Sequence, residues 1–161
     1  MKESYFKFWW KSGNEHSVHS PFIFNLLTKG LYPKDRKWRG QAKKDAFISR
    51  LETYYVPKSI GGVGRDTSLV SNVVDLSVIV DTVDMILVSK CDQEVNVTML
   101  FSKMHNDSVL VVDRRSGNEE AELLWAEIIK EERFTVTIDF YYFGVAYVRS
   151  EQLKQHFVLR M

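Results

Sequence analysis

Nearly continuous runs of apolar residues mark the second part of the chain. The runs MILVS (residues 85–89) and SVLVVD (residues 108–113) are short and rich in valine and isoleucine or leucine. Runs of this kind are typical of strands that are covered on both faces of a sheet. Between them, the spacing of apolar residues in 93–105 predicts a helix that crosses from one strand to the next.

The pattern then predicts a long amphipathic helix followed by a hairpin. Residues 118–132 repeat apolar side chains at helical spacing and carry acids in the first turn, which the helix dipole favours. Residues 134–140 alternate apolar and polar side chains, and 144–149 follow after a short connection, so we predict an antiparallel hairpin. Residues 157–160 can add a short strand.

The first part of the chain is predicted to be helical, and the secondary structure at its junction with the second part is undecided. We predict helices at 3–10, at 20–30 with a Ser–Pro start, and at 34–54. Within 60–84, SIGGVG predicts a strand and a turn. The following TSLVSNVVDLSVIVD fits a helix, a strand or one of each, and periodicity does not decide between them.

These elements predict one α/β domain. Strand, helix, strand, helix, strand and then a hairpin is the order of an α/β sheet with an antiparallel edge. A length of 161 residues fits a single domain. Because the composition changes near residue 57, we divide this domain into a helical N-terminal extension, residues 1–56, and an α/β core, residues 57–161.

Charge and composition argue against several classes of protein. The net charge is +1, whereas nucleic-acid-binding domains usually carry a clear basic excess, so we do not expect nucleic acid as a partner. No apolar run approaches the roughly 18 to 20 residues of a membrane helix. The N-terminus does not fit a secretory signal, and the single Cys91 cannot form an internal disulfide. We expect a cytoplasmic protein without a membrane partner.

Two segments carry a resemblance to a known family. The first is HSVHSPFIFNLLTKGLY, residues 16–32, and the second runs from TVTIDFYYFGVAYVR, residues 135–149, into EQLKQHFVLRM, residues 151–161. Together they resemble bacterial class I S-adenosylmethionine-dependent methyltransferase-like proteins, which have a helical N-terminal extension and end in a β-hairpin and an HF-x-LR-like tail. The resemblance implies a three-layer, Rossmann-like sheet of seven strands whose last strand is antiparallel.

The chain is short for that fold. Only 20 residues separate Gly64 from the implied fourth strand, which begins at Met85. A complete domain places two strands and two helices there, and each strand–helix unit takes about 30 residues. At least one unit is therefore expected to be missing. A carboxylate for the ribose hydroxyls belongs about 20 residues after the glycines. Asp81 and Asp84 have that spacing, but they directly precede the fourth strand.

Gly61, Gly62 and Gly64 are the candidate cofactor-binding residues. They end or follow the first strand, which the resemblance places at 59–63, and a glycine turn lets a backbone approach a ligand closely. The resemblance implies that this turn contacts S-adenosylmethionine. Because short glycine clusters are also common in ordinary turns, a turn that binds no cofactor is the competing interpretation.

Asp113 and His19 are the candidate catalytic residues. Asp113 ends a strand, where ligands gather in open α/β sheets. Arg114 and Arg115 follow it, so we expect an ion pair with an arginine rather than a metal site. His19 lies three residues after His16 and can act as a base near neutral pH. A structural role beside the following helix is the simpler interpretation of both histidines.

Three further features have a functional and a structural interpretation. Cys91, beside Lys90, could be a reactive thiol or an unreactive one. A basic stretch around Trp38 could bind a polyanion or form a solvated helix face. Its basic residues are Lys29, Lys34, Arg36, Lys37, Arg39, Lys43 and Lys44. An aromatic cluster near the N-terminus could seal the core or contact a partner chain. Its members are Tyr5, Phe6, Phe8, Trp9 and Trp10.

The sequence thus supports three hypotheses of function. The first is a degenerate methyltransferase-like domain that has no methyl-transfer activity, holds no cofactor and acts through protein contacts. An exposed sheet edge would favour a homodimer or another protein partner. The alternative is an active S-adenosylmethionine-dependent methyltransferase that acts on a small molecule, with transfer driven by proximity and orientation. The third is a polyanion-binding module.

Overall fold

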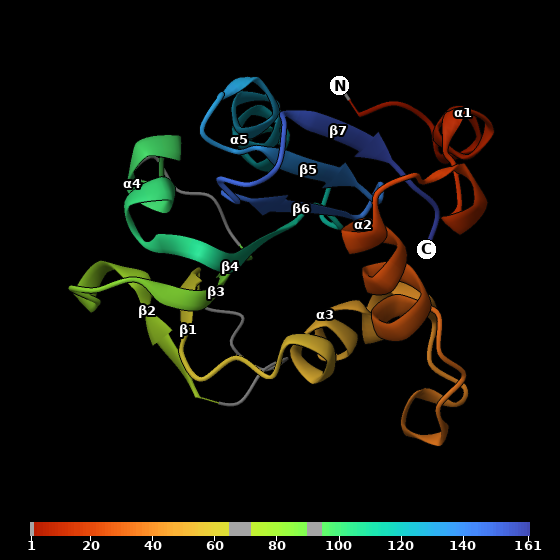
Figure 1. Ribbon diagram of the computed structural model, residues 1–161, viewed down its shortest axis with the longest axis horizontal. Coiled ribbons are helices and arrows are strands. Elements are labelled where there is room, and N and C mark those ends of the chain that lie inside the picture. Colours follow the sequence, from red (N-terminus) through yellow and green to blue (C-terminus); the bar gives the residue numbers. More distant parts are fainter. Residues whose placement is uncertain (1, 65–71, 90–94) are drawn as a thin grey trace.

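The chain folds around a mixed β-sheet (Figure 1). A computed structural model describes residues 2–64, 72–89 and 95–161. Within these residues the sheet has seven strands in the order β2-β1-β3-β4-β6-β5-β7. The strands are β1 (Ile60–Val63), β2 (Val73–Asp75), β3 (Val83–Val88), β4 (Met104–Asp113), β5 (Val136–Asp139), β6 (Phe143–Tyr147) and β7 (Gln155–Val158).

Strand direction divides the sheet into two parts. Strands β2, β1, β3 and β4 are parallel to one another. Strand β6 is antiparallel to both of its neighbours, β4 and β5, which confirms the predicted hairpin. The C-terminal strand β7 then adds to the far edge, parallel to β5. The protein is therefore α/β with a mixed sheet, an arrangement compatible with a Rossmann-like fold.

Helices cover both faces of the sheet (Figure 1). One face carries α2 (Pro21–Asn25), the π-helix η2 (Leu26–Leu31) and α3 (Lys43–Tyr55), and the other carries α4 (Val97–Ser102) and α5 (Glu119–Lys130). Along β4, Val109 and Val111 pack toward the first face, and Leu110 and Val112 toward the second. This two-sided burial explains why the strand is a continuous apolar run rather than an alternating one.

The N-terminal segment joins the C-terminal tail. Helix α1 (Tyr5–Lys11) and the 3-10 helix η1 (Glu15–Ser17) lie beside β7, and both ends of the chain lie on that side of the molecule (Figure 1). Between α1 and η1, the Gly13 amide donates to the Val158 carbonyl at 2.9 Å, and the Arg160 amide donates to the Gly13 carbonyl at 2.9 Å. The first and last residues of the chain therefore stabilise one another.

The predicted helix at 34–54 is wrong, because the segment forms two helices. A 3-10 helix, η3 (Arg36–Trp38), is separated from α3 by a turn at Gly40, whose φ is +79°. Ala42 then has extended backbone and begins α3 without a side-chain cap. A left-handed residue cannot continue a right-handed helix, so the break falls at the one residue in the stretch that tolerates this conformation.

Two other helix boundaries also differ from those predicted. The crossover helix of 93–105 begins only at Val97 and ends at Ser102, and residues 93 and 94 lie outside the described residues. Met104 and His105 belong instead to β4, since Met104 pairs with Val83. The helix predicted to stop at 30 continues to Leu31 as the π-helix η2. The helix predicted at 118–132 is confirmed as α5.

The open segment before β3 contains a short strand and a short helix. Strand β2 pairs with β1, and the 3-10 helix η5 (Leu76–Val78) follows it directly. Residues 65–71 lie outside the described residues. The part that is described therefore places one strand between β1 and β3 in the sequence.

Candidate functional site

The predicted glycine turn lies at the carboxyl edge of the parallel strands. Gly61 and Gly62 belong to β1, and Gly64 follows it with a φ of +85°, which favours glycine. In the parallel register Gly62 pairs with Asp75, the last residue of β2. Next to them, the Ser89 hydroxyl donates to the Val63 carbonyl at 3.1 Å. Ligands of open α/β sheets bind at such carboxyl edges, so the glycines lie at the edge where a ligand of this kind of sheet would bind.

The space beside the two strand glycines is filled by the chain's own side chains. A Cβ atom placed on Gly61 would lie 2.5 Å from Cδ1 of Leu76, in η5. A Cβ atom on Gly62 would lie 2.5 Å from Cγ1 of Val73, in β2. Both distances are too short for any side chain. Close packing therefore accounts for glycine at both positions without a ligand.

Asp75 is a candidate residue beside the glycines that the sequence analysis did not name. It ends β2 beside the glycine turn, where an acidic residue binds ribose hydroxyls in dinucleotide-binding sheets. Its Oδ1 accepts hydrogen bonds from the Ser77 amide at 2.9 Å and the Ser77 hydroxyl at 2.7 Å, which caps η5. The available signal was the run VVD, an apolar pair ending in an acid 11 residues after Gly64.

Asp84, the carboxylate with the expected spacing, is at the opposite end of its strand. Its Oδ2 accepts from the amides of Lys58 and Ser59 at 2.6 and 3.2 Å. Its Oδ1 lies 2.9 Å from Nε2 of His105. Because the Asp107 amide donates to the other ring nitrogen of His105, Nε2 carries the proton and donates to Asp84. Asp84 therefore joins β1, β3 and β4 at their amino ends. Asp81, just before β3, is exposed.

These contacts also set the charge of Asp84. Partial burial alone would raise the pKa of its carboxyl group. The hydrogen bonds from the Lys58 amide, the His105 ring and the Ser59 amide stabilise the carboxylate and together lower the pKa below its ordinary value. The group is thus a charged structural link.

Asp113 is paired with an arginine, as predicted. It ends β4, and its carboxylate accepts from the Arg115 guanidinium, with Nη2 at 2.7 Å from Oδ2 and Nε at 3.0 Å from Oδ1. Arg114 points the other way and is only 5% exposed. Its guanidinium donates to Glu122 at 2.7 Å and to Asp139 at 2.9 Å. This end of the sheet is therefore crossed by internal ion pairs.

Lys2 closes the same ion-pair cluster from the N-terminus. Its ammonium group donates to the Arg114 carbonyl at 2.7 Å and lies 3.3 Å from Glu122. It also lies 4.7 Å from the ring centre of Tyr141. Burial lowers the pKa of Lys2, although the charge of Glu122 acts in the opposite direction. The first described residue thus covers the carboxyl ends of β4 and β5.

His19 lies in a different part of the molecule from Asp113. It is exposed and lines a groove of about 460 Å³ beside β7, three strands away from β4 in the sheet. His156, which the sequence did not single out, lines the same groove, and its Nδ1 lies 2.9 Å from the hydroxyl of the buried Thr137. Burial lowers the pKa of His156. His16 is exposed and lies 3.5 Å from Glu15. The structure does not bring the two candidate catalytic residues together.

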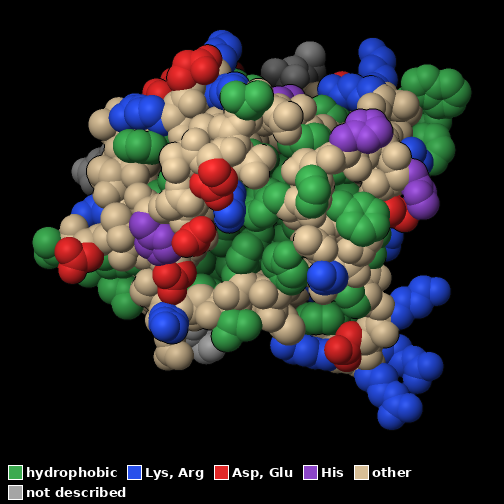
Figure 2. All heavy atoms as spheres, viewed as in Figure 1, with side chains coloured by type: hydrophobic (Ala, Val, Ile, Leu, Met, Phe, Trp, Pro, Cys, Tyr) green, Lys and Arg blue, Asp and Glu red, His purple; other side chains and the backbone are tan. Residues whose placement is uncertain are grey.

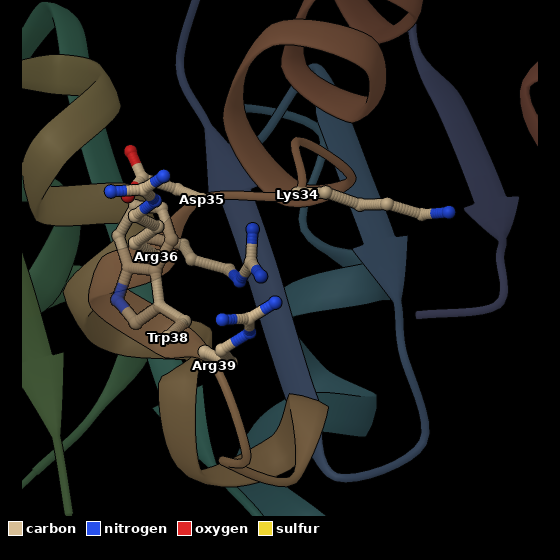
Figure 3. Close-up of a pocket in the computed structure, with 6 residues that line it drawn as sticks. Lys34, Asp35, Arg36, Trp38 and Arg39 are labelled. Atoms are coloured by element: carbon tan, nitrogen blue, oxygen red, sulfur yellow. The ribbon is translucent and has the colours of Figure 1, made fainter.

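A second groove, here called the basic groove, lies at the turn between η2 and α3 (Figure 3). It encloses about 370 Å³ and is lined by Lys34, Asp35, Arg36, Trp38, Arg39 and Arg50. Trp38 is only 7% exposed, and its indole N–H donates to the Ser49 hydroxyl at 3.2 Å. The predicted basic stretch thus becomes a folded turn with a tryptophan at its base.

Neither a metal centre nor a membrane span was found in the described part of the chain. Within residues 2–64, 72–89 and 95–161, no group of three or more His, Cys, Asp or Glu side chains could hold a metal ion. In the same residues no helix is both long and apolar enough to cross a bilayer. The candidate thiol Cys91 and its neighbour Lys90 lie outside the described residues.

Comparison with known proteins found no match. No family model matches the chain, and no curated protein or solved structure matches it either. Function must therefore be inferred from the residues and their geometry.

Proposed function

We propose that the chain is a degenerate methyltransferase-like domain that has lost methyl transfer and acts through protein contacts. The order of its elements supports this proposal. A helical N-terminal segment, a parallel part, and a hairpin whose second strand is antiparallel are the features that the family resemblance implies. Where that family places two strands between the first and fourth, the described residues hold one, β2.

The observation that carries the proposal is the filled space beside Gly61 and Gly62, the two glycines of β1. A cofactor needs open space beside the glycines, because their missing side chains are what permits close approach. Here Leu76 and Val73 lie where the Cβ atoms of Gly61 and Gly62 would be. The loss of a strand–helix unit accounts for this packing, since η5 covers β1 directly in place of a longer connection.

The carboxylates of the other candidate residues also form hydrogen bonds within the chain. Asp113 is held by Arg115, and Asp75 caps η5. A carboxylate that serves as a base or a ribose ligand must exchange such a partner for the substrate. These pairings support the loss of activity.

The test is isothermal titration of the folded protein with S-adenosylmethionine and with S-adenosylhomocysteine. We expect no heat of binding from either ligand, in protein whose fold is verified by circular dichroism. Saturable binding with a micromolar dissociation constant would contradict the proposal.

The alternative, an active methyltransferase, is favoured by the position of Asp75. Its carboxylate stands at the end of β2 beside Gly62, as a ribose-binding acid would. If the ligands bind, Asp75→Asn should then weaken binding, whereas Asp81→Asn, at an exposed acid just before β3, should not. Equal effects of both substitutions would place the ligand elsewhere.

The proposed protein contact is a second copy of the chain at the β2 edge. Among the described strands, β2 lies at the edge of the sheet, and sheet edges invite pairing. Exposed valines surround it: Val74 in β2 itself, Val78 at 68% exposed and Val80 at 90%. A two-fold arrangement would bury these side chains on both copies.

Light scattering measures this contact. We expect a dimer whose population rises with protein concentration, and the double variant Val78→Asp/Val80→Asp should be monomeric. Leu153→Asp is the matched control, because Leu153 is equally exposed but precedes β7 at the other edge. A wild-type monomer at every concentration would contradict the proposed dimer.

A further inference from the structure

Basic and acidic side chains are unevenly distributed along the chain. Residues 29–50 contain eight basic and two acidic side chains, although the net charge of the whole chain is only +1. The remaining residues contain 14 basic and 19 acidic side chains. Figure 2 shows Lys and Arg side chains projecting together at the corner where Figure 1 places the turn between η2 and α3. A low net charge therefore does not describe this surface.

The cations of the basic groove are not neutralised by the fold. Lys34, Arg36 and Arg39 are exposed, and none of them forms an ion pair with another described residue. The one acid that lines the groove, Asp35, uses Oδ1 to accept from the Lys37 amide at the start of η3. Figure 3 shows the Arg36 and Arg39 side chains extending into the same space.

Contacts of Arg50 hold the turn that carries these cations. Arg50 stacks on Trp38, with its guanidinium carbon 4.3 Å from the ring centre, and donates to the Pro33 carbonyl at 2.8 Å. Its Nε is buried and has no hydrogen-bond partner among the described residues. The turn is therefore anchored to α3 at its base, so Arg36 and Arg39 project from a fixed platform, which lowers the entropy cost of binding an anion.

We propose that the basic groove binds the phosphate backbone of a nucleic acid. Guanidinium groups donate two parallel hydrogen bonds to phosphate oxygens, and converging arginines suit a chain of phosphates. A membrane surface is less well matched, because the one large aromatic side chain of the groove, Trp38, is buried and cannot insert into lipid. Burial of Trp38 also removes a stacking platform for bases. Binding should therefore be independent of base sequence.

The experiment is fluorescence anisotropy with labelled oligo-uridine and oligo-adenosine of equal length, at several salt concentrations. We expect similar affinities for both and a linear fall of log K with log salt. The double variant Arg36→Gln/Arg39→Gln should weaken binding roughly tenfold at moderate salt and reduce the salt slope by about 1.4. The matched control Lys58→Gln/Lys130→Gln removes two exposed charges outside the groove and should change neither value.

Three results would overturn the proposal. The first is no binding to either oligonucleotide at low salt. The second is an equal loss of affinity in the groove variant and in the control variant. The third is binding to vesicles of anionic phospholipid without binding to the oligonucleotides. None of these measurements depends on S-adenosylmethionine, so failure here and failure of the proposed function remain distinguishable.

Discussion

Arginine is used in two opposite ways at the two ends of this molecule. At the carboxyl edge of the sheet, Arg114 is buried between Glu122 and Asp139. In the basic groove, Arg36 and Arg39 are exposed and form no ion pair with described residues. A paired, buried arginine is a structural element, because its hydrogen bonds are already made. An unpaired, exposed arginine keeps its hydrogen-bonding capacity for a ligand.

Gly61 and Gly62 resemble the paired Arg114, because neither feature is free to contact a ligand. Leu76 and Val73 fill the space beside Gly61 and Gly62, and Glu122 accepts a hydrogen bond from the Arg114 guanidinium, so both features are occupied by contacts within the chain. The comparison teaches that a residue type in the expected position is not a site until its contacts are known.

Removing the Arg114 guanidinium should cause the largest loss of stability. Arg114→Met keeps much of the side-chain volume but removes the guanidinium from Glu122 and Asp139, which keep only Lys2 and the Tyr141 amide as partners, respectively. Breaking a buried pair costs about 3 to 5 kcal/mol, and we expect about 3 kcal/mol because both acids keep some contact with water. Urea denaturation measures the difference. Arg133→Met, which breaks the exposed pair with Glu131, is the control and should cause no resolvable change. Equal effects would show that the Arg114 cluster is not structural.

Adding a methyl group at the glycine turn should have the next largest effect. In Gly62→Ala the new Cβ would meet the short, branched Val73 side chain at 2.5 Å, and overpacking of this kind costs about 1 to 3 kcal/mol. In Gly61→Ala the Cβ would lie 2.5 Å from Cδ1 of the fully buried Leu76 and 3.2 Å from Cδ1 of Ile79, so we expect a loss at least as large. Thermal or urea denaturation compares the two. Stability unchanged in both would mean that space remains there for a ligand.

Acid should remove a smaller contribution from Asp84. Because its pKa in the folded state is lowered, the carboxylate stabilises the fold above its unfolded pKa of about 4. That stabilisation is lost as the pH falls through the folded pKa. Wild type should thus exceed Asp84→Asn in unfolding free energy at pH 7, and the gap should narrow below about pH 4. The gap is modest because the side chain is one-third exposed. A gap that stays constant with pH would contradict this account.

The smallest effect should come from the groove arginines. Arg36→Gln/Arg39→Gln removes two exposed side chains that form no ion pair with described residues, so we expect a change in unfolding free energy within about 0.5 kcal/mol. The same denaturation experiment as for Arg114→Met checks this value. A loss comparable to that of Arg114→Met would show that the groove is a structural cluster too.

The sequence predicted the elements that repeat a clear period. The apolar runs gave β3 and the inner part of β4, the apolar stripe gave α5, and alternation with a tight turn gave the hairpin of β5 and β6. Strand β2 could not be predicted, because three residues carry no period. It is a strand because it pairs with β1, and the apolar pattern of the sequence does not reveal that pairing. The break of the basic helix spans Arg39 and Ala42, which have extended backbone, and Gly40, which is left-handed.

The sequence indicated where the candidate residues lie in the sheet, but it could not predict most of their contacts. The glycines do lie at a carboxyl edge, and Asp113 does pair with an arginine. Asp75 was missed because spacing alone pointed to Asp84, which lies at the amino end of its strand. The sequence could not predict the basic groove either, because Arg50 and Trp38 come into contact only when α3 packs against the turn.

We propose that the glycine turn at residues 61–64 binds no cofactor. The most direct measurement is nuclear magnetic resonance of isotope-labelled protein titrated with S-adenosylhomocysteine, observing the backbone amides of Gly61, Gly62 and Gly64. The account predicts that these three signals stay unchanged at saturating ligand. Saturable shifts of the three glycines together with Asp75 would show a working cofactor site and contradict it.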